Sequence, residues 1–388
     1  MVRPSDGGAA VAPAKRVQVP LGDLKAQYKL LKDEILSSLN EVAESTAYVL
    51  GPKVAAFEKD FAAYAGTKHC VGVNSGTSAL HLALICAGVG AGDEVISVPM
   101  TFIATSWAIS YAGATPVYVD VDPDTATMDA SLVEKKITGK TKALLPVHLY
   151  GQPADMEPLL DVSKRHGIPI VEDVAQAHGA TYRGHKVGTM GQTGCFSFYP
   201  GKNLGAYGEG GMVTTNNAEY ARTIKMLRDW GAEKKYQHVL KGYNFRLEGI
   251  QGAVLRVKLK YLEKWTEQRR AAAARYDQQL AGTGIPTPHA HAHNRHVYHI
   301  YAIRTATRAA WQEALNAAGV QSGIHYPIPV HLLPAYADLG YKAGQFPHSE
   351  RAAAETMSLP MFPELTVEQC QTVASAVKAL AETNAAAA

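Results

Sequence analysis

Residues 70–87 read CVGVNSGTSALHLALICA, an apolar run that passes through a short polar turn into a second apolar stretch. Cys70–Val73 has the length of a buried strand, and Ala79–Ala87 has the length of a helix. No formally charged residue occurs from Cys70 to Gly92, but the polar residues and glycines of this stretch favour a strand and a helix over a membrane span. A strand followed directly by a helix is the repeating unit of α/β proteins.

The same alternation continues along the chain. Further apolar runs, expected to be strands, are Glu94–Val98, Pro116–Val119, Ala143–Val147, Pro169–Val171, Cys195–Phe198 and Met212–Thr215. Helical patterns lie at Val54–Tyr64, Ala79–Ala87, Ile103–Tyr111, Met156–Arg165, Glu219–Trp230 and, as one long segment, Leu247–Leu280. Strands that alternate with helices predict an α/β fold with a mostly parallel central sheet flanked by helices.

The 388 residues are enough for two or three domains. A Gly/Pro-rich break at Gly282–Pro288 precedes an expected strand, His296–Arg304, and expected helices near Arg308–Ala318 and Val367–Ala381. We therefore expect a flexible N-terminal tail over residues 1–16, a large α/β domain over residues 17–270 and a smaller C-terminal α+β domain over residues 271–388.

Composition excludes several classes of protein. The formal net charge is +3, with no basic stripe, which argues against a nucleic-acid partner. The 4 cysteines are far apart and form no metal-ligand spacing, as is typical of a reducing compartment. Residues 1–16 lack the apolar core of a signal peptide, so we expect a cytoplasmic protein with no membrane association.

Three segments carry groups suited to chemistry. The first is the turn Gly72–Ser78, where backbone amides at a helix N-terminus and the hydroxyls of Thr77 and Ser78 suit a phosphate dianion. An ordinary helix cap is the alternative. The second segment, Val171–His178, places Asp173 at the end of an apolar strand, where α/β proteins bind ligands. A helix cap is again the alternative.

The third segment, Ser197–Gly205, reads SFYPGKNLG and holds Lys202 in a loop between Pro-Gly and further glycines. Taken alone, Lys202 has the plain alternative of a solvated surface lysine. Other glycine motifs do not fit. A Walker A loop needs glycine at Phe196 and a hydroxyl at Asn203, and a dinucleotide fingerprint needs glycine at Asp93. Neither a GxSxG elbow nor an HExxH motif is present.

Six blocks together resemble one known family. The blocks are SGTSALHLAL (75–84), GDEVISVPMTFIATSWAI (92–109), VEDVAQAHGA (171–180), SFYPGKNLGAYGEGG (197–211), GYNFRLEGIQGA (242–253) and HYPIPVH (325–331). In this order they resemble the DegT/StrS-type nucleotide-sugar aminotransferases, over about residues 19–366. The resemblance implies the type I fold of pyridoxal-phosphate (PLP) transferases, a PLP/PMP cofactor and a homodimer with shared active sites.

The resemblance also implies roles for individual residues. Lys202 would hold PLP as a Schiff base and move the proton during transfer, and Asp173 would pair with the pyridine nitrogen. Gln176 would bind the phenolic oxygen of the ring, and Phe102 would stack on the ring face. The phosphate would be held by Gly76, Thr77, Ser78 and Ser197, with Asn244 from the neighbouring subunit.

The expected reaction is transfer of an amino group from L-glutamate, which leaves as 2-oxoglutarate, to a nucleotide-linked keto sugar. Some family members have histidine in place of the lysine and dehydrate the sugar, so Lys202 favours transfer. Tyr199 and His325 look like residues of members that act at C3 of a UDP- or dTDP-linked sugar, and we expect both in catalysis and substrate binding, with Tyr326. Arg246 would bind a carboxylate or, alternatively, close an ion pair at the subunit boundary.

Several alternatives stay open. The sugar could carry its keto group at C4, or the substrate could be a keto-inositol of aminoglycoside assembly. A regulatory protein on the same fold would need a DNA- or partner-binding module, and none is visible. The histidine run His289, His291, His293, His296 and His299 has no clustered cysteine or acid, so we expect no metal site.

Overall fold

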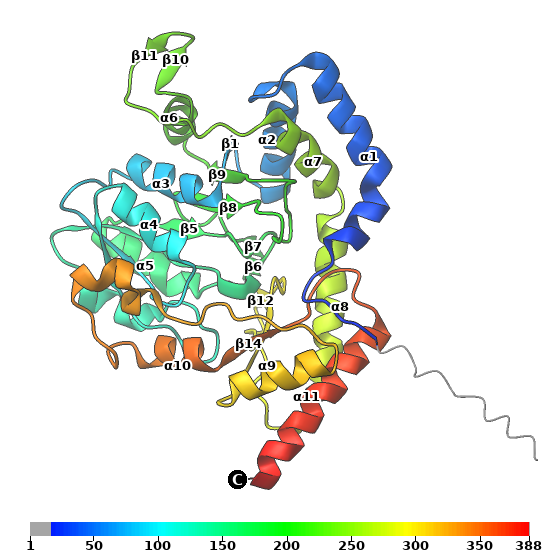
Figure 1. Ribbon diagram of the computed structural model, residues 1–388. Coiled ribbons are helices and arrows are strands. Elements are labelled where there is room, and N and C mark those ends of the chain that lie inside the picture. The colour runs from blue at the N-terminus through cyan, green and yellow to red at the C-terminus, as the bar shows by residue number, and fades with distance from the viewer. Residues whose placement is uncertain (1–16, 388) are drawn as a thin grey trace, which may run out of the picture.

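A central sheet organises the molecule. The computed structural model describes residues 17–387, so the expected tail at residues 1–16 lies outside the described residues. The strands of the sheet are β1 (His69–Val73), β2 (Glu94–Ser97), β3 (Thr115–Tyr118), β4 (Thr141–Leu144), β5 (Val171–Asp173), β8 (Thr193–Ser197) and β9 (Gly211–Thr215). They pair in the orders β3–β2–β4 and β1–β9–β8–β5, and parallel bridges from Leu144 to Ile170 and from Val147 to Asp173 join the two groups (Figure 1).

The sheet is mostly parallel, as predicted. Strand β9 runs antiparallel to both of its neighbours, while β2 is parallel to β3 and β4, and β5 is parallel to β8. The carboxyl ends of the parallel strands therefore meet along one edge of the sheet, which is where α/β proteins bind their ligands.

Helices cover both faces of the sheet. One face packs on α3 (Gly76–Cys86), α4 (Ile103–Tyr111) and α6 (Ala218–Arg228), and the other on α2 (Gly51–Ala65), α5 (Met156–His166) and α7 (Gly249–Leu259). Successive strand residues point to opposite faces of the sheet. Cys195 packs with α3, α4 and α6, whereas Phe196 packs with α2 and α7. These two buried layers fix the strand ends that carry the site.

The predicted single helix Leu247–Leu280 is wrong, because the structure breaks it into α7 and α8 (Leu262–Leu280) at Lys260–Tyr261. The C-terminal half of α8 buries a different surface from α7. Helix α7 packs against α2, whereas Ala272, Tyr276 and Leu280 of α8 belong to the core of the C-terminal part. The turn between them redirects the chain from one core to the other.

Two further elements differ from the sequence prediction. Helix α1 (Leu24–Ser45) was not predicted, and it packs Leu31 and Ile35 against Trp265 of α8. Of the expected strand His296–Arg304, only β13 (Tyr301–Arg304) forms. Residues 296–300 instead follow an irregular path along Gly151, where Val297 donates its backbone hydrogen to the Gly151 carbonyl at 3.1 Å.

The C-terminal part is a smaller α+β unit. Strand β13 pairs with β14 (Thr356–Leu359), and the unit's helices are α9 (Arg308–Ala317), α10 (Pro347–Glu355) and α11 (Val367–Ala387). Val19, from the start of the described chain, packs in the same core and bridges to Val320. Helix α8 crosses residue 270, and the predicted boundary between domains at that position stays a prediction.

Short strands and turns complete the chain. These are β6 (Thr181–Tyr182), β7 (His185–Lys186), β10 (Ala232–Lys234), β11 (Gln237–His238), β12 (Asn294–Arg295) and 3₁₀ turns at Ala130–Leu132, Glu134–Lys136, Leu149–Gly151, Val330–Leu332 and Pro334–Leu339. Over the described range 17–387, no helix has both the length and the apolar content needed to cross a bilayer.

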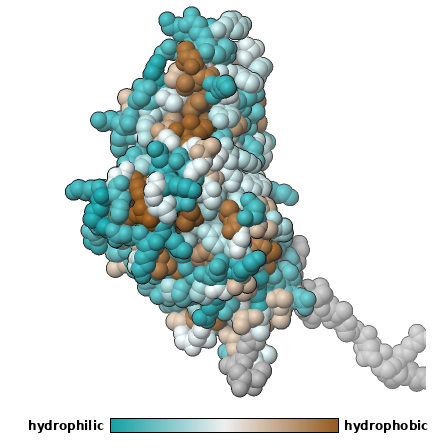
Figure 2. Space-filling view, turned by 90° about the vertical axis from the view of Figure 1, so that its left-hand side faces the viewer, coloured by the Kyte–Doolittle hydropathy of each residue, from teal (hydrophilic) through white to brown (hydrophobic). Residues whose placement is uncertain are grey.

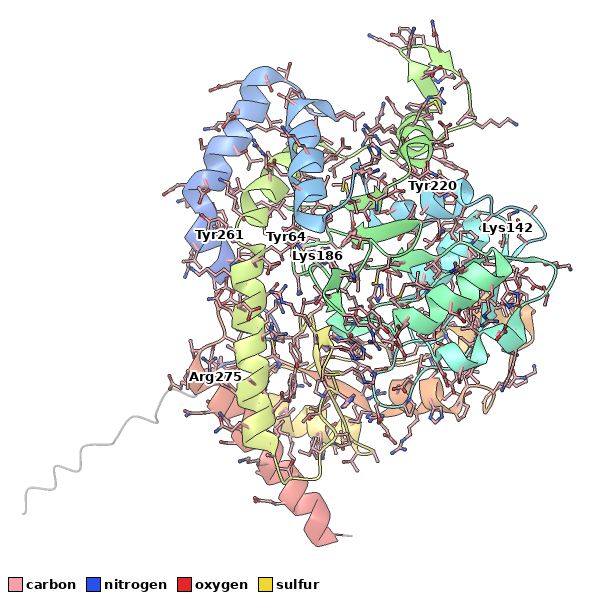
Figure 3. The ribbon with its side chains drawn as sticks, turned by 180° about the vertical axis from the view of Figure 1, so that it is seen from behind. Tyr64, Lys142, Lys186, Tyr220, Tyr261 and Arg275 are labelled. Carbon is pink, nitrogen blue, oxygen red and sulfur yellow. The ribbon has the colours of Figure 1, made fainter. Side chains whose placement is uncertain are left out.

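A joint behind the sheet ties α2 to β7 and α8 (Figure 3). The Nζ of Lys186 lies 3.7 Å from the ring centre of Tyr64, whose hydroxyl donates to Glu263 of α8 at 2.6 Å. Gly179 is required beside this joint, since it has φ +79° and an added Cβ would lie 2.1 Å from the Tyr64 hydroxyl. The joint holds the long helix against the domain that carries the strand ends.

Candidate active site

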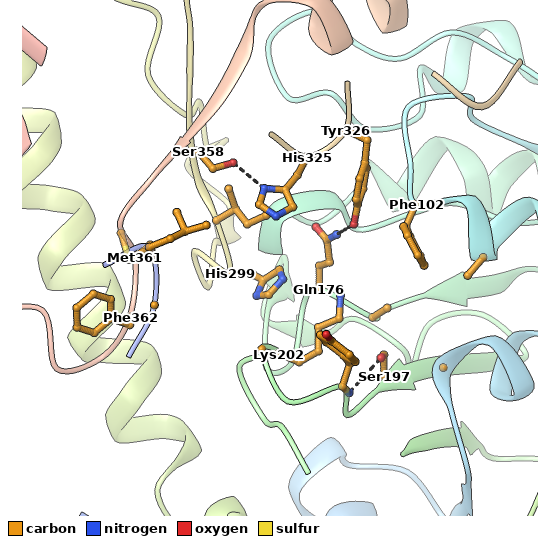
Figure 4. A pocket seen from close by; sticks show the side chains of 18 of the residues that line it. Phe102, Gln176, Ser197, Lys202, His299, His325, Tyr326, Ser358, Met361 and Phe362 are labelled. Atoms are coloured by element: carbon orange, nitrogen blue, oxygen red, sulfur yellow. Dashed lines mark hydrogen bonds between the residues drawn. The ribbon is translucent and has the colours of Figure 1, made fainter. Parts of the chain in front are cut away.

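A cavity of about 760 Å³ lies at the carboxyl edge of the sheet (Figure 4). Its lining includes Ser75–Thr77 after β1, Asp173 at the end of β5, and Thr101, Phe102, Ala104 and Thr105 after β2. Ser197 and Lys202 come from the end of β8 and the loop beyond it, and His325, Tyr326 and Ser358 come from the C-terminal part. Segments distant in sequence therefore meet where the strand order predicts a ligand site.

Lys202 is held in the tight loop that follows β8. Its backbone nitrogen donates to the Tyr199 carbonyl at 2.8 Å, and Gly205 is needed in the same loop because an added Cβ would lie 2.2 Å from the Pro200 oxygen. Burial lowers the pKa of Lys202 to about 8, and the negative charge of Asp173 acts in the opposite direction. Lys202 is therefore a buried amine with a larger neutral fraction near neutral pH than an ordinary lysine has.

Asp173 ends β5 as a buried carboxylate. Its Oδ2 accepts a hydrogen bond from the Thr105 hydroxyl at 2.8 Å, and its Oδ1 accepts one from the Ala175 backbone at 3.1 Å. Burial raises the pKa of Asp173, while these two hydrogen bonds and the charge of Lys202 favour the anion. A cationic partner in the cavity would stabilise the ionised form further.

The N-terminus of α3 lines one end of the cavity, and this end is suited to binding an anion. Ser75 caps the helix by accepting from the Ser78 backbone at 3.1 Å, and the first amides of a helix have no partner within it. An added Cβ on Gly76 would lie 2.7 Å from the Cβ of Ser197, so glycine allows the two segments to touch. Thr77 and Ser197 both line the cavity.

Ser78 has a different place from the one expected. Its hydroxyl donates to the Asn74 side chain at 2.7 Å, and it is not among the residues that line the cavity. The structure thus brings Gly76, Thr77 and Ser197 together at the cavity and commits the Ser78 hydroxyl to the turn before the helix.

Aromatic and amide groups line the middle of the cavity. Phe102, the residue that precedes α4, is half exposed, and its ring centre lies 5.4 Å from that of Tyr326. Gln176 is fixed at both ends of its amide, because Oε1 accepts from the Tyr150 backbone at 2.7 Å and Nε2 donates to the Tyr326 hydroxyl at 3.0 Å. One amide hydrogen of Gln176 is left for a further acceptor.

His325 and Tyr199 line the cavity together with Lys202. The imidazole Nδ1 of His325 pairs with the Ser358 hydroxyl at 2.8 Å, and the backbone oxygen of His325 accepts from the hydroxyl of Tyr150. Burial, assisted by the charge of Lys202, lowers the pKa of His325. Tyr199 is 56% exposed, so its ring is available to a ligand that enters the cavity.

Three residues of the site, Thr105, His299 and His178, have no sequence signal that predicts a role for them. Thr105 lies four residues after Thr101, so both hydroxyls are close to the start of α4. His299 belongs to the histidine run, but it lines the cavity and its Nδ1 pairs with Asn203 at 3.1 Å. Burial lowers the pKa of His299 well below its usual value and that of His178 to about 3, so both imidazoles near Lys202 are neutral.

Asn244 and Arg246 are not among the residues that line this cavity. Asn244 is exposed, and its backbone bridges to Asp229. Arg246 pairs with the Asp229 carboxylate at 3.1 Å and lies over the ring of Trp230. An ion pair was one of the two alternatives for Arg246, and here it forms within a single chain.

The histidine run forms no metal centre in the described part of the chain. His289, His291 and His293 contact one another ring to ring, with His291 and His293 stacked at 5.5 Å. No group of three or more histidine, cysteine, aspartate or glutamate side chains with the geometry to hold a metal occurs among residues 17–387. The chemistry of the cavity rests instead on an amine, a carboxylate and an anion site.

The family models and curated relatives agree on the kind of protein. The family model described as the DegT/DnrJ/EryC1/StrS aminotransferase family matches residues 29–378. The chain is 49% identical to a protein of Geobacillus stearothermophilus named pleiotropic regulatory protein, over 92% of this chain and 97% of the relative. It is 48% identical to dTDP-3-amino-3,4,6-trideoxy-alpha-D-glucose transaminase of Streptomyces venezuelae, over 95% of this chain and 98% of that enzyme.

Solved structures give the same result. The crystal structure of S. venezuelae DesV in complex with a ketimine intermediate superimposes with a TM-score of 0.92 at 48% identity, covering 94% of this chain and 99% of DesV. NtdA of Bacillus subtilis with bound cofactor PMP superimposes with a TM-score of 0.86 at 30% identity, covering 96% of this chain and 87% of NtdA. The predicted fold class is confirmed by these matches.

Proposed function

The chain belongs to the DegT/DnrJ/EryC1/StrS aminotransferase family, and on that premise we propose that it transfers the amino group of L-glutamate to C3 of a nucleotide-linked 3-keto sugar. The observation that carries the proposal is the position of Lys202. Its amine is buried, has a lowered pKa and lies in the cavity with Asp173 and the start of α3. The proposal includes the identity of the nucleotide, which is UDP or dTDP.

The residues of the cavity fit PLP. Lys202 supplies the amine, Asp173 offers an anionic partner to the ring nitrogen, and the first amides of α3 offer donors to the phosphate. Gln176 has one amide hydrogen free for the phenolic oxygen, and Phe102 presents an exposed ring face. When bound, PLP supplies an electron sink that stabilises negative charge at the carbon bearing the amine.

The chain's own groups then have distinct tasks. Neutral Lys202 is a base of suitable pKa, which takes a proton from the carbon of the donor and returns it to the carbon of the acceptor. The hydrogen bonds from Thr105 and Ala175 favour the charged form of Asp173, which would face the ring nitrogen. The buried walls of the cavity limit the access of water, which favours transfer over hydrolysis.

The choice of C3 rests on residues that line the cavity and on the relatives. Tyr199, His325 and Tyr326 line the cavity beside Lys202 and offer a hydroxyl, an imidazole and a ring to a sugar. The S. venezuelae relative at 48% identity is by its name a transaminase of a 3-amino sugar. Because only the ring carbon held near Lys202 can react, contacts to neighbouring sugar oxygens decide the position.

A shared site in a homodimer is part of the proposal. Asn244 and Arg246 point to it because neither lines the cavity of its own chain, although each lies in a block typical of the family. In a dimer Asn244 would bind the phosphate held by the partner, and Arg246 would supply a carboxylate site for glutamate or a uronic-acid sugar. Exposed apolar side chains occur on the surface, including Tyr48, Val49, Tyr207 and Ile250. Figure 2 shows further brown, apolar patches on a face that is otherwise mostly hydrophilic.

Two alternative enzyme activities would use the same cofactor residues: transfer to a 4-keto nucleotide sugar and transfer to a free keto-inositol. A regulator is a third alternative, because one relative carries a regulatory name. The lowered pKa of Lys202 favours catalysis over regulation, because a protein that only binds a partner gains nothing from a buried amine. The cytoplasmic location expected from the sequence also stays a prediction.

A panel assay distinguishes these functions. The purified protein is incubated with L-glutamate and, in separate reactions, a 3-keto nucleotide sugar, a 4-keto nucleotide sugar and a keto-inositol, and 2-oxoglutarate is measured. We expect at least tenfold faster turnover with the 3-keto nucleotide sugar, the discrimination given by about 1.4 kcal/mol of transition-state binding. Absence of PLP absorbance in the purified protein, with no turnover of any substrate, would support the regulator instead.

A further inference from the structure

A chain of three buried side chains runs from the start of α4 to the end of β5. Thr101, Thr105 and Asp173 are all at least 95% buried and all line the cavity. The Thr105 hydroxyl donates to Asp173 Oδ2 at 2.8 Å, so the only hydrogen of that hydroxyl is used. The Thr101 hydroxyl, 2.8 Å from Thr105 Oγ1, is therefore the donor of the second bond.

The two carboxylate oxygens of Asp173 are held by different elements. Oδ1 receives the Ala175 backbone hydrogen from its own strand end, and Oδ2 receives the Thr105 hydroxyl from α4. A carboxylate fixed at both oxygens cannot rotate about its Cβ–Cγ bond without losing a charge-assisted bond. Each oxygen keeps lone pairs for one more donor, which must approach from the cavity.

The same turn of α4 also presents Phe102 to the cavity. The residue precedes the helix, and its backbone oxygen accepts from the Thr105 nitrogen at 3.1 Å. Residues 101–105 thus position the ring of Phe102 and, through Thr105, the carboxylate of Asp173, which would face the ring nitrogen of PLP. A shift of this turn would change both contacts together.

We propose that Thr105, supported by Thr101, is a positioning residue that fixes the orientation and charge of the Asp173 carboxylate toward the cofactor's ring nitrogen. The role rests on the proposed function, since it has meaning only where PLP binds. The Thr105 hydroxyl acts through Asp173 and makes no bond to the substrate. Loss of that hydroxyl would leave Oδ2 of a buried anion without its donor, which favours uptake of a proton by Asp173.

The experiment uses PLP-loaded Thr105→Val, which keeps the shape of the side chain and removes the hydroxyl. We expect kcat to fall by roughly tenfold to a hundredfold, the usual effect of one lost bond to a charged group, with KM for the sugar unchanged. The ¹⁵N NMR shift of the bound ring nitrogen should move toward that of the unprotonated ring. Thr105→Ser should restore both values, and Thr101→Val should give a smaller change in the same direction.

A double mutant separates positioning from simple damage. If Thr105 acts through Asp173, Thr105→Val should have no further effect on kcat in an Asp173→Asn background. Thr266→Val is the matched control, because Thr266 is equally buried in α8 and its hydroxyl has no hydrogen-bond partner among the described residues. It should leave kcat and the ring-nitrogen shift unchanged.

The ring-nitrogen shift is followed across pH in wild type and Thr105→Val. The titratable groups whose charges act on Asp173, or are affected by it, are Lys202, His148, Cys195 and Tyr326. These four groups are present in both proteins. A pH midpoint of the ring-nitrogen shift that differs between the two proteins therefore reports a changed environment of Asp173. An unchanged ring-nitrogen shift in Thr105→Val, or an equal loss of kcat with and without Asp173, would overturn the positioning role. If wild type bound no PLP, the proposed function itself would fail.

Discussion

The side-chain amide of Gln176 donates a hydrogen bond to the hydroxyl of Tyr326 across 3.0 Å. Gln176 follows β5 and faces the cofactor end of the cavity, whereas Tyr326 belongs to the segment expected to approach the sugar. The bond therefore joins the two halves of the site, and the Tyr150 backbone holds the other end of the same amide at 2.7 Å. Cofactor binding and the placement of the substrate segment should depend on each other.

Replacement of Tyr326 by phenylalanine tests that dependence. Tyr326→Phe removes one neutral hydrogen bond, so we expect PLP to bind about fivefold more weakly, equivalent to about 1 kcal/mol. PLP affinity is measured by titration of the apoprotein and followed by absorbance. Tyr199→Phe is the matched control, since its hydroxyl makes no hydrogen bond within the described chain, and equal weakening in both variants would refute the role of the bond.

The rate of PLP capture should reveal the lowered pKa of Lys202. Only the neutral amine attacks the aldehyde, so the rate for the apoprotein should rise about tenfold per pH unit at low pH and level off near pH 8. Asp173, His178, His299 and His325 act on the charge of the amine or are affected by it, and burial lowers the pKa of all three imidazoles, which favours their neutral forms. A midpoint near the ordinary lysine value would contradict the account, as would borohydride labelling of a lysine other than Lys202.

Asp173→Asn should fold and bind some PLP yet turn over far more slowly. The variant removes the anion beside the ring nitrogen, and loss of such an oriented charge costs a few kcal/mol, on the order of 10²–10³ in kcat. Circular dichroism and PLP absorbance check that the variant is folded and loaded. Turnover close to wild type in such a protein would show that Asp173 has no electronic role.

Mixing two inactive variants tests the shared site. If Asn244 serves the partner's cofactor, one site of each Lys202→Ala/Asn244→Ala hybrid dimer is intact and the other carries both lesions. We expect mixing after mild dissociation to restore activity, up to about one quarter of the wild-type value for random pairing at equal concentrations. Recovery should be absent if Lys202 and Asn244 act in one chain, and gel filtration of each variant reports whether dimers form.

Much of this architecture follows from the sequence pattern. The helix Ile103–Tyr111 was predicted with the bounds that the structure has, because its apolar residues repeat with helical spacing between two strands. The expected family, fold class, enzyme class and PLP cofactor are confirmed by relatives that match nearly the whole chain. The expected C3 position is supported by the name of the S. venezuelae relative.

The differences between the sequence prediction and the structure arise from tertiary contacts, which a local sequence pattern does not reveal. The break at Lys260–Tyr261 arises because the C-terminal half of α8 packs into the core of the C-terminal part, whereas α7 packs against α2. His299 and Thr105 are ordinary residues in the sequence, and they matter because the fold places one near Lys202 and the other against Asp173. Individual site roles, the dimer and the amino donor stay predictions.

Product analysis with labelled donor tests the central claim most directly. The purified protein is incubated with a UDP- or dTDP-linked 3-keto sugar and ¹⁵N-labelled L-glutamate, and the product is examined by NMR. The account predicts the label on C3 of a sugar still attached to its nucleotide, with one 2-oxoglutarate formed for each amino sugar. Label on C4 would contradict the assigned position, and transfer only to a free keto-inositol, or no transfer of label at all, would contradict the proposed function itself.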